Sequence, residues 1–144
     1  MKKISVMLVD DNNTFRETFK LIMSRYEDYE IVGEAENGVQ ALKLLDKIVP
    51  DIVIMDIQMP EMNGIEATKR MSWQYPFIKF IAVTMYNDEA YIYKLLQAGF
   101  KGCIFKDNVC DELDGALIQL ANNKYFFPEN IKISSNGKNS TNSR

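Results

Sequence analysis

The sequence predicts an α/β fold in which helices cover both faces of a five-stranded parallel sheet. The first observation behind this prediction is that five short apolar runs without helical period alternate with five segments whose apolar residues recur at helical spacing. The second is that the chain has 144 residues, enough for one domain with a substantial core. The sequence contains no internal repeat. A single doubly wound sheet follows, for which the strand order 2-1-3-4-5 is the natural one.

The first predicted strand covers residues 4–9, and the first helix begins near Asn13 or Thr14, both good helix caps. Four apolar residues at helical spacing mark this helix: Phe15, Phe19, Ile22 and Tyr26. The second strand covers residues 30–35. It is weaker than the first because Gly33 interrupts it.

The middle of the chain is predicted to contain a helix, a strand and a further helix. The earlier helix ends before Pro50 and is marked by Val39, Leu42, Leu45 and Val49. Residues 52–55 form the third strand, an apolar run of the length of a buried strand, and Pro60 and Gly64 mark the loop after it. The later helix ends before Pro76 and is marked by Ile65, Thr68, Met71 and Tyr75.

Two more strands and two more helices complete the sheet. Residues 77–83 are predicted to form the fourth strand, and residues 87–98 a helix that stops at Gly99. That helix is marked by Ile92, Leu95 and Leu96. Residues 101–105 form the fifth strand. The last helix is marked by Leu113, Ala116, Leu117 and Leu120.

These elements predict one domain over residues 1–123. The apolar character of the next residues predicts an extension over 124–133 that packs back onto the domain. Residues 134–144 consist of Ser, Asn, Thr, Gly and isolated basic residues, with nothing apolar to bury. This composition is typical of a flexible linker or tail.

Composition and charge exclude several classes of function. The net charge of −3 offers no basic surface, so we expect this chain alone to bind neither DNA nor an anionic membrane. No apolar stretch is long enough to span a membrane, and the amino terminus runs into a strand rather than a signal peptide. A cytoplasmic location with reduced thiols at Cys103 and Cys110 is the simplest expectation. The absence of histidine removes imidazole bases and most zinc sites.

Polar residues follow four of the predicted strands at their carboxyl ends. They are Asp10 and Asp11 after the first strand, Asp56 after the third, Thr84 after the fourth and Lys106 after the fifth. The carboxyl ends of parallel strands share one edge of the sheet, and ligands bind there, at the switch point between strands one and three. Each residue alone is most often a solvated strand end. Three carboxylates, a hydroxyl and an ammonium at one crevice instead indicate a functional site.

Neighbouring carboxylates repel one another, so this cluster needs a cation to stay ionised. An all-oxygen site with few ligands, partly open to water, suits Mg²⁺ or Mn²⁺ better than zinc. A divalent ion could neutralise an incoming phosphoryl group and align it with a carboxylate nucleophile. Lys106 would add a positive charge, and Thr84 a hydroxyl donor to a phosphoryl oxygen. A carboxylate nucleophile needs no base, which fits a chain without histidine.

From residue 3 to about residue 122 the sequence resembles the response regulator receiver domains of two-component signalling. The matching residues are Asp10-Asp11, Asp56 within Met-Asp-Ile-Gln-Met-Pro-Glu-Met-Asn-Gly, Thr84 and Lys106. The resemblance implies the flavodoxin-like receiver fold. Residues 98–107 and 125–129 look most similar to the NarL/FixJ-type (LuxR-family) subfamily. Members of that subfamily usually continue into a helix-turn-helix output domain, which we do not expect within these 144 residues.

By this resemblance, Asp56 accepts a phosphoryl group from a histidine kinase. The Mg²⁺ or Mn²⁺ would be held by Asp56, by the backbone carbonyl of Gln58, and by Asp10 or Asp11. Thr84 and Lys106 would bind the phosphoryl oxygens and couple them to the face of the fourth helix. The resemblance also implies an output domain or downstream protein that regulates transcription, and it allows a homodimer on phosphorylation. It implies no enzymatic activity beyond the domain's own phosphorylation and dephosphorylation.

Two positions depart from the family pattern. Many receivers have a mobile aromatic residue three positions before the lysine, where this chain has Cys103. Many also have a proline after the lysine, where this chain has Asp107. We expect a trans bond there, because a cis bond would cost about 2.5–4 kcal/mol. By the resemblance, Gln58 and Tyr86 lie beside the path of the hydrolytic water, and Tyr86 is expected to shield the acyl phosphate and to replace the missing mobile aromatic.

Other functions stay open at this point. A flavin-binding flavodoxin relative shares the fold, although the run 10–13, Asp-Asp-Asn-Asn, would repel a flavin phosphate. An aspartyl phosphatase usually has a second Asp two residues after the nucleophile, where this chain has Gln58. A metal-independent pseudo-receiver would be expected to lack one of the five functional residues. A stand-alone receiver that acts by protein–protein contact is the fourth alternative.

Overall fold

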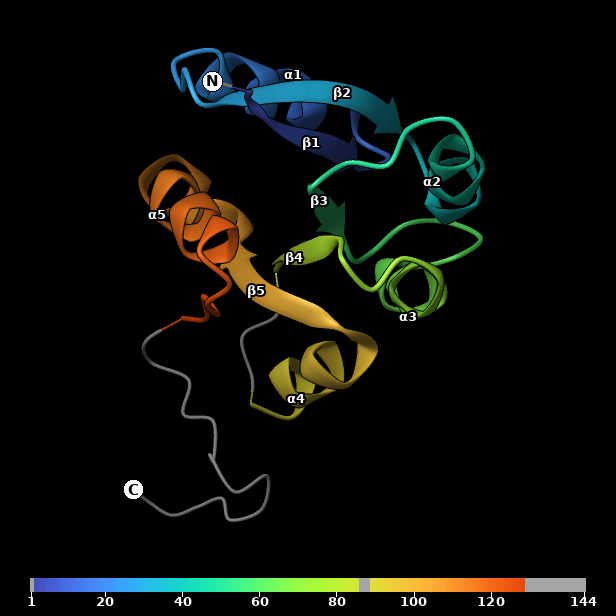
Figure 1. Ribbon diagram of the computed structural model, residues 1–144. Coiled ribbons are helices and arrows are strands. Elements are labelled where there is room, and N and C mark those ends of the chain that lie inside the picture. The colour runs from blue at the N-terminus through green and yellow to red at the C-terminus, as the bar shows by residue number, and fades with distance from the viewer. Residues whose placement is uncertain (1, 86–88, 129–144) are drawn as a thin grey trace.

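The computed structural model describes residues 2–85 and 89–128 (Figure 1). Its sheet is parallel and has the order β2-β1-β3-β4-β5. The strands are β1 (Ile4–Val9), β2 (Tyr29–Ala35), β3 (Ile52–Asp56), β4 (Lys79–Thr84) and β5 (Phe100–Phe105). The helices are α1 (Asn13–Met23), α2 (Gly38–Leu45), α3 (Gly64–Gln74), α4 (Glu89–Ala98) and α5 (Val109–Ala121), with a short 3-10 helix η1 (Lys106–Asn108) before α5. The predicted fold class and strand order are confirmed.

Alternate residues of the strands face two separate hydrophobic cores. In β1, Met7 and Val9 face the core beneath α2, α3 and α4, whereas Val6 and Leu8 face the core beneath α1 and α5. Figure 1 shows these two groups of helices on opposite sides of the sheet. Burial on both faces explains why the strands are continuous apolar runs rather than alternating ones.

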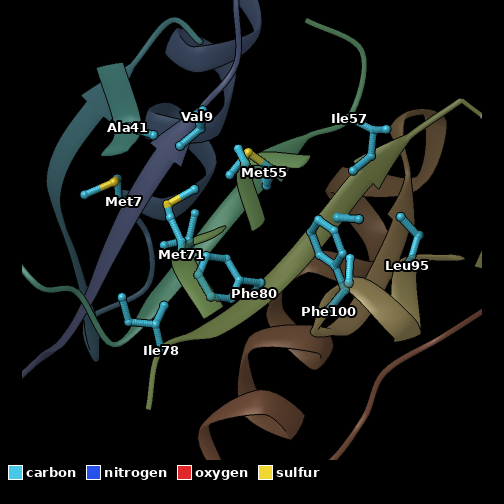
Figure 2. Packing of buried hydrophobic residues seen from close by; sticks show 14 of the residues in the cluster. Met7, Val9, Ala41, Met55, Ile57, Met71, Ile78, Phe80, Leu95 and Phe100 are labelled. Atoms are coloured by element: carbon cyan, nitrogen blue, oxygen red, sulfur yellow. The ribbon is translucent and has the colours of Figure 1, made fainter. Parts of the chain in front are cut away.

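The core beneath α2, α3 and α4 is drawn in Figure 2. The rings of Phe80 and Phe100 meet edge to face with their centroids 6.4 Å apart. Ala41, Met71 and Leu95, one from each helix, are fully buried against the sheet. Burying a side chain as large as Met71 or Leu95 stabilises the fold by about 1.5–3 kcal/mol. This core therefore holds the three helices in place and fixes the strand ends beside them.

Three predicted element ends are wrong by a few residues. β4 begins at Lys79, so Phe77 lies in the turn before it with its side chain 90% exposed. α1 and α2 are shorter than predicted, so Tyr26 and Val49 lie in the loops beyond them. In each case an apolar loop residue continues the spacing of the element, and spacing alone does not show where the chain turns.

α1 begins at Asn13 as predicted, but its capping residue is Asn12 rather than Asn13 or Thr14. The Oδ1 of Asn12 accepts a hydrogen bond from the Phe15 N–H at 2.9 Å, and the Asn12 N–H donates to Asp10 Oδ1 at 2.8 Å. The Asn13 side chain is engaged elsewhere, as the acceptor of a hydrogen bond from Arg16. The cap thus joins the start of α1 to the acidic residue at the end of β1.

Two glycines allow close packing around the sheet. At Gly64, the first residue of α3, an added Cβ would collide with the main-chain carbonyl of Asp56. The Gly64 N–H also donates to the Ile57 carbonyl at 2.8 Å. Gly99 follows α4 with a φ of +113°, the left-handed conformation that ends helices, as predicted. α3 therefore packs directly against the main chain that carries Asp56.

After α5 the chain returns to the edge of the sheet beside β5. The Phe126 N–H donates to the Lys101 carbonyl at 3.0 Å, and the Cys103 N–H donates to the Phe126 carbonyl at 2.8 Å. This main-chain pairing holds the beginning of the predicted extension against β5. The rest of that extension and the predicted tail lie outside the described residues. Within residues 2–85 and 89–128, no helix is long and apolar enough to cross a membrane.

Candidate functional site

Four strands bring polar residues to one edge of the sheet. Val9 of β1 pairs with Met55 of β3, so the residues after them emerge side by side. β4 and β5 continue the same parallel register at their carboxyl ends. The structure therefore places at this edge the side chains of Asp10, Asp56, Thr84 and Lys106.

Three carboxylates converge there. One oxygen from each of Asp10, Asp11 and Asp56 lies within 4.8 Å of the others. Asp10 and Asp56 are each only 3% exposed, whereas Asp11 is open to solvent. Lys106 Nζ lies 3.4 Å from Asp56 Oδ1 and 3.9 Å from Asp10 Oδ2. One ammonium thus faces two buried carboxylates, with a third carboxylate at the rim.

Burial makes this cluster costly to ionise. It raises the pKa of Asp56 to about 6, and the charge of Asp10 adds to that effect while Lys106 opposes it. Burial also raises the pKa of Asp10 above its usual value, although the hydrogen bond that Asp10 accepts from the Asn12 N–H lowers it in part. A further positive charge would lower the cost of keeping both groups ionised.

Two buried oxygens are available to such a charge. Asp10 Oδ2 and Asp56 Oδ2 are buried and accept no hydrogen bond from the part of the chain that the structure describes, although Lys106 Nζ lies 3.9 Å from Asp10 Oδ2. Buried carboxylate oxygens in this state are costly unless they pair with a charge or coordinate a metal. With Asp11 they form an all-oxygen donor set, partly open to water, which fits Mg²⁺ or Mn²⁺.

An open cavity of about 790 Å³ adjoins the cluster. Asp11 lines it from the β1–α1 loop, Gln58 and Pro60 from the β3–α3 loop, and Tyr91 and Lys94 from α4. Gln58 itself is exposed. The cavity is open to solvent and reaches the cluster at Asp11.

The remaining predicted site residues lie in different surroundings. Thr84 is 1% exposed at the end of β4. Cys103 is fully buried in the core beneath α2, α3 and α4, and burial raises the pKa of its thiol to about 12, as is typical of an inert core cysteine. Tyr86 lies outside the described residues. The bond between Lys106 and Asp107 is trans, as predicted.

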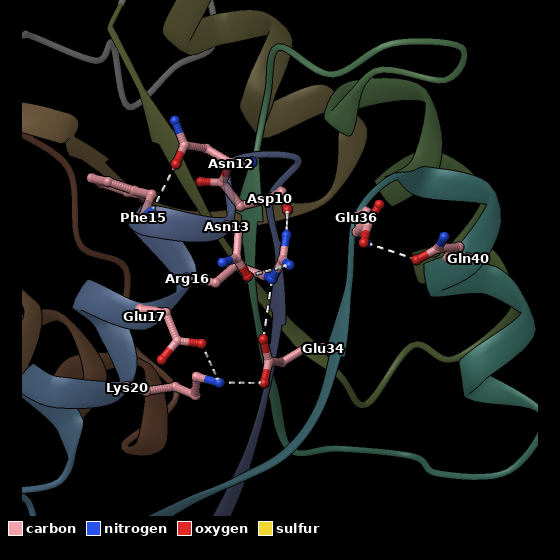
Figure 3. Close-up of polar contacts among 10 residues, drawn as sticks. All are labelled: Asp10, Asn12, Asn13, Phe15, Arg16, Glu17, Lys20, Glu34, Glu36 and Gln40. Atoms are coloured by element: carbon pink, nitrogen blue, oxygen red, sulfur yellow. Dashed lines mark hydrogen bonds and ion pairs between the residues drawn. The ribbon is translucent and has the colours of Figure 1, made fainter.

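A buried arginine beneath the acidic pair was missed by sequence reasoning (Figure 3). The side chain of Arg16 is 9% exposed, and its Nη1 donates to the Asp10 carbonyl at 2.6 Å. Its Nη2 donates to Asn13 Oδ1 at 3.0 Å, and its Nε to Glu34 Oε1 at 3.1 Å. Arg16 therefore joins α1, the Asp10 main chain and β2 in one network.

Glu34 anchors this network from β2. Its Oε2 forms a second ion pair with Lys20 Nζ at 2.8 Å. The hydrogen bonds from Lys20 and Arg16 hold the pKa of the Glu34 carboxyl below its usual value. Arg16 and Glu34 lie 18 positions apart on different elements. No local spacing connects them, so the sequence carried no signal for this pair.

Known proteins are similar to this chain in sequence and in fold. The family model of the response regulator receiver domain matches residues 6–118. The transcriptional regulatory protein DegU of Brevibacillus brevis is 36% identical over 111 residues, which cover 77% of this chain and 47% of DegU. The transcriptional regulatory protein YdfI of Bacillus subtilis (strain 168) is 39% identical over 108 residues, covering 75% of this chain and 50% of YdfI. The chain thus spans about half the length of these curated relatives.

Solved structures agree with the sequence relatives. The crystal structure of a LuxR-family two-component response regulator from Aurantimonas sp. SI85-9A1 has a TM-score of 0.85 to this chain at 29% identity. The similarity covers 90% of this chain and 93% of that chain. The family match contains all five polar residues of the sheet edge and ends within α5. On this sequence and structural evidence, the chain belongs to the response regulator receiver domain family.

Proposed function

We propose that this chain is the phosphoacceptor domain of a two-component response regulator and that Asp56 receives the phosphoryl group. The observation that carries the proposal is the convergence of Asp10, Asp11 and Asp56 within 4.8 Å, with the Lys106 ammonium 3.4 Å from Asp56. Asp56 is the carboxylate nearest to Lys106 and lies at the centre of the sheet edge, on β3. Membership of the receiver family adds support.

In the proposed reaction, a carboxylate oxygen of Asp56 attacks the phosphorus of a phosphohistidine on a partner histidine kinase. The P–O bond to Asp56 forms, the P–N bond breaks, and the imidazole leaves with the electron pair. Asp56 must be ionised to attack, and a pKa of about 6 leaves it mainly ionised at neutral pH. Lys106 turns its charge to one phosphoryl oxygen, and Thr84 donates its hydroxyl hydrogen to another.

The same cluster is proposed to hold Mg²⁺ or Mn²⁺ through Asp56, the backbone carbonyl of Gln58, and Asp10 or Asp11. The buried Oδ2 atoms of Asp10 and Asp56, which lack hydrogen bonds from the described residues, support this assignment. When bound, the ion would offset the negative charge of the carboxylates and of the incoming phosphoryl group. Arg16 holds the main chain of Asp10 in place for this role.

The proposed partners are a histidine kinase and either an output domain of the same protein or a downstream protein. DegU and YdfI are named transcriptional regulatory proteins, and this chain spans about half of each, which supports regulation of transcription as the output. Residues 134–144 would then form the linker, after a packed extension over 124–133. A homodimer on phosphorylation and a cytoplasmic location belong to the same proposal.

The test uses acetyl phosphate, a small phosphodonor that needs no kinase. With Mg²⁺ present, intact mass should rise by one phosphoryl group. Asp56→Asn or an excess of chelator should abolish the gain, whereas Asp46→Asn, which changes an exposed carboxylate away from the site, should leave it intact. A phosphorylated Asp56→Asn protein would contradict the assignment. Turnover of phosphate esters would favour a phosphatase instead.

A further inference from the structure

The Lys106 ammonium contacts an aromatic ring that the proposed reaction does not use. Its Nζ lies over the face of Phe15, 4.8 Å from the ring centroid. The same Nζ is the group that pairs with Asp56 at 3.4 Å and with Asp10 at 3.9 Å. A cation within about 6 Å of a ring centroid is attracted by the negative face of the ring. The ammonium is therefore held by two carboxylates and a ring face together.

The Phe15 ring is itself fixed in position. It packs edge to face against Phe19, with ring centroids 5.0 Å apart and the ring planes at 87°. Phe19 is 2% exposed in the core beneath α1 and α5. The backbone N–H of Phe15 is held by the Asn12 cap at 2.9 Å. A rigid helix start thus presents the ring to Lys106.

Lysine needs such a support more than most side chains. Its ammonium is a compact, strongly hydrated charge on a flexible four-carbon stem, and the Lys106 side chain is 23% exposed. Without a contact on its apolar side, the ammonium could turn toward solvent and leave Asp56. A ring face restricts that motion and adds attraction at the position where the charge is needed.

We propose that Phe15 is a positioning residue for Lys106, holding the ammonium beside Asp56 through a cation–π contact so that it meets the phosphoryl group as it arrives. This role rests on the proposed function, because that function assigns Lys106 to the phosphoryl oxygens. In the sequence, Phe15 is one of the apolar residues at helical spacing, and nothing local connects it to Lys106. Its position over Lys106 appears only when the first helix and the end of β5 are brought together.

A fluorination series separates this contact from packing. Progressive fluorination of a phenylalanine ring keeps its shape nearly constant while weakening its negative face. Phenylalanine and its mono-, di- and trifluoro analogues would be incorporated site-specifically at position 15, and the rate of phosphorylation by acetyl phosphate with Mg²⁺ would be measured. We expect the rate to fall stepwise, by roughly three- to tenfold at trifluorophenylalanine. The same series at Phe80, buried in the core on the opposite face of the sheet, is the control for ring fluorination and should leave the rate nearly constant.

A second readout uses the unphosphorylated protein with chelator present. The ring current of Phe15 should shift the Lys106 side-chain methylene proton resonances upfield. Phe15→Leu should remove the shift and increase the mobility of that side chain, and Phe15→Tyr should keep both near wild type. If the wild type is phosphorylated and the fluorinated proteins react at the same rate, the positioning role alone is overturned. The absence of the ring-current shift would overturn it as well. A wild type that takes up no phosphoryl group would overturn the proposed function, and the positioning role with it.

Discussion

At the scale of single residues, the buried carboxylate of Asp56 destabilises the folded protein when it is ionised. Its side chain is 3% exposed, and burial together with the charge of Asp10 raises its pKa from 3.8 to about 6. The folded protein therefore binds this proton more tightly than the unfolded chain does. The stabilising contribution of the group is fully present below about pH 3.8 and is lost as the pH rises to about 6.

Asp56→Asn should therefore stabilise the protein above pH 6 when no divalent ion is present. We expect its free energy of unfolding at pH 7–8 to exceed that of wild type by on the order of 2 kcal/mol, and the gain to shrink toward pH 4. Urea denaturation from pH 4 to pH 8 in the presence of chelator measures both. Asp46→Asn, at an exposed carboxylate, should show little change at any pH. A wild type more stable than Asp56→Asn at pH 8 would show that burial does not strain this carboxyl.

At the scale of elements, Arg16 attaches α1 to β2 and to the main chain of Asp10. Arg16→Met removes three hydrogen bonds and leaves the Asp10 carbonyl and the Glu34 carboxylate without this partner. We expect a loss of on the order of 2–4 kcal/mol in the free energy of unfolding, together with weaker Mg²⁺ binding in calorimetric titrations.

The matched control for that change is Arg70→Met. Arg70 pairs with Glu66 one turn away on α3, and their side chains are 57% and 49% exposed. Solvent screens such a pair, so its loss should cost less than about 0.5 kcal/mol. Equal losses of unfolding free energy in Arg16→Met and Arg70→Met would mean that the burial of Arg16 does not strengthen its contacts.

The packing of α3 against β3 gives a second prediction at this scale. In Gly64→Ala, the new Cβ would collide with the Asp56 carbonyl, so either α3 or the end of β3 must move. We expect a loss of about 1–3 kcal/mol and slower phosphorylation. Gly115→Ala in α5 is the control, because nothing lies within 4 Å of an added Cβ there, and it should stabilise the helix by about 0.5–1 kcal/mol. Thermal denaturation of both variants measures this difference, and a harmless Gly64→Ala would refute the close contact.

At the scale of the whole molecule, phosphorylation should shift a population that involves α4, β5 and α5. A phosphoryl group adds charge at Asp56 that Thr84 and Lys106 are expected to meet. Thr84 is the last residue of β4, the strand before α4, and Lys106 directly follows β5. Amide chemical shifts should therefore change across the described parts of these three elements as well as at the site. The free energy that shifts the population cannot exceed the difference in phosphoryl-binding free energy between the active and inactive conformations. We therefore expect some activity without phosphate. Changes confined to residues around Asp56 would count against this coupling.

The sequence by itself determined the order of the elements, the parallel sheet and the edge at which the site lies. These follow from local patterns, because the alternation of apolar runs with helical spacing specifies strand–helix units. Parallel strands then bring their carboxyl ends together whatever the detailed packing. Asp10, Asp56 and Lys106 could be placed at one edge for this reason.

Only the tertiary structure decided what surrounds those residues. The apolar residues Phe77 and Val49 continue the patterns of their elements, yet the chain turns there and leaves both exposed. The contacts of Arg16 with β2 and of Phe15 with Lys106 join residues from different elements. Their burial and distances depend on how α1 lies against the sheet. Apolar periodicity reports which side of a helix is buried, and it does not report which distant residue that side will meet.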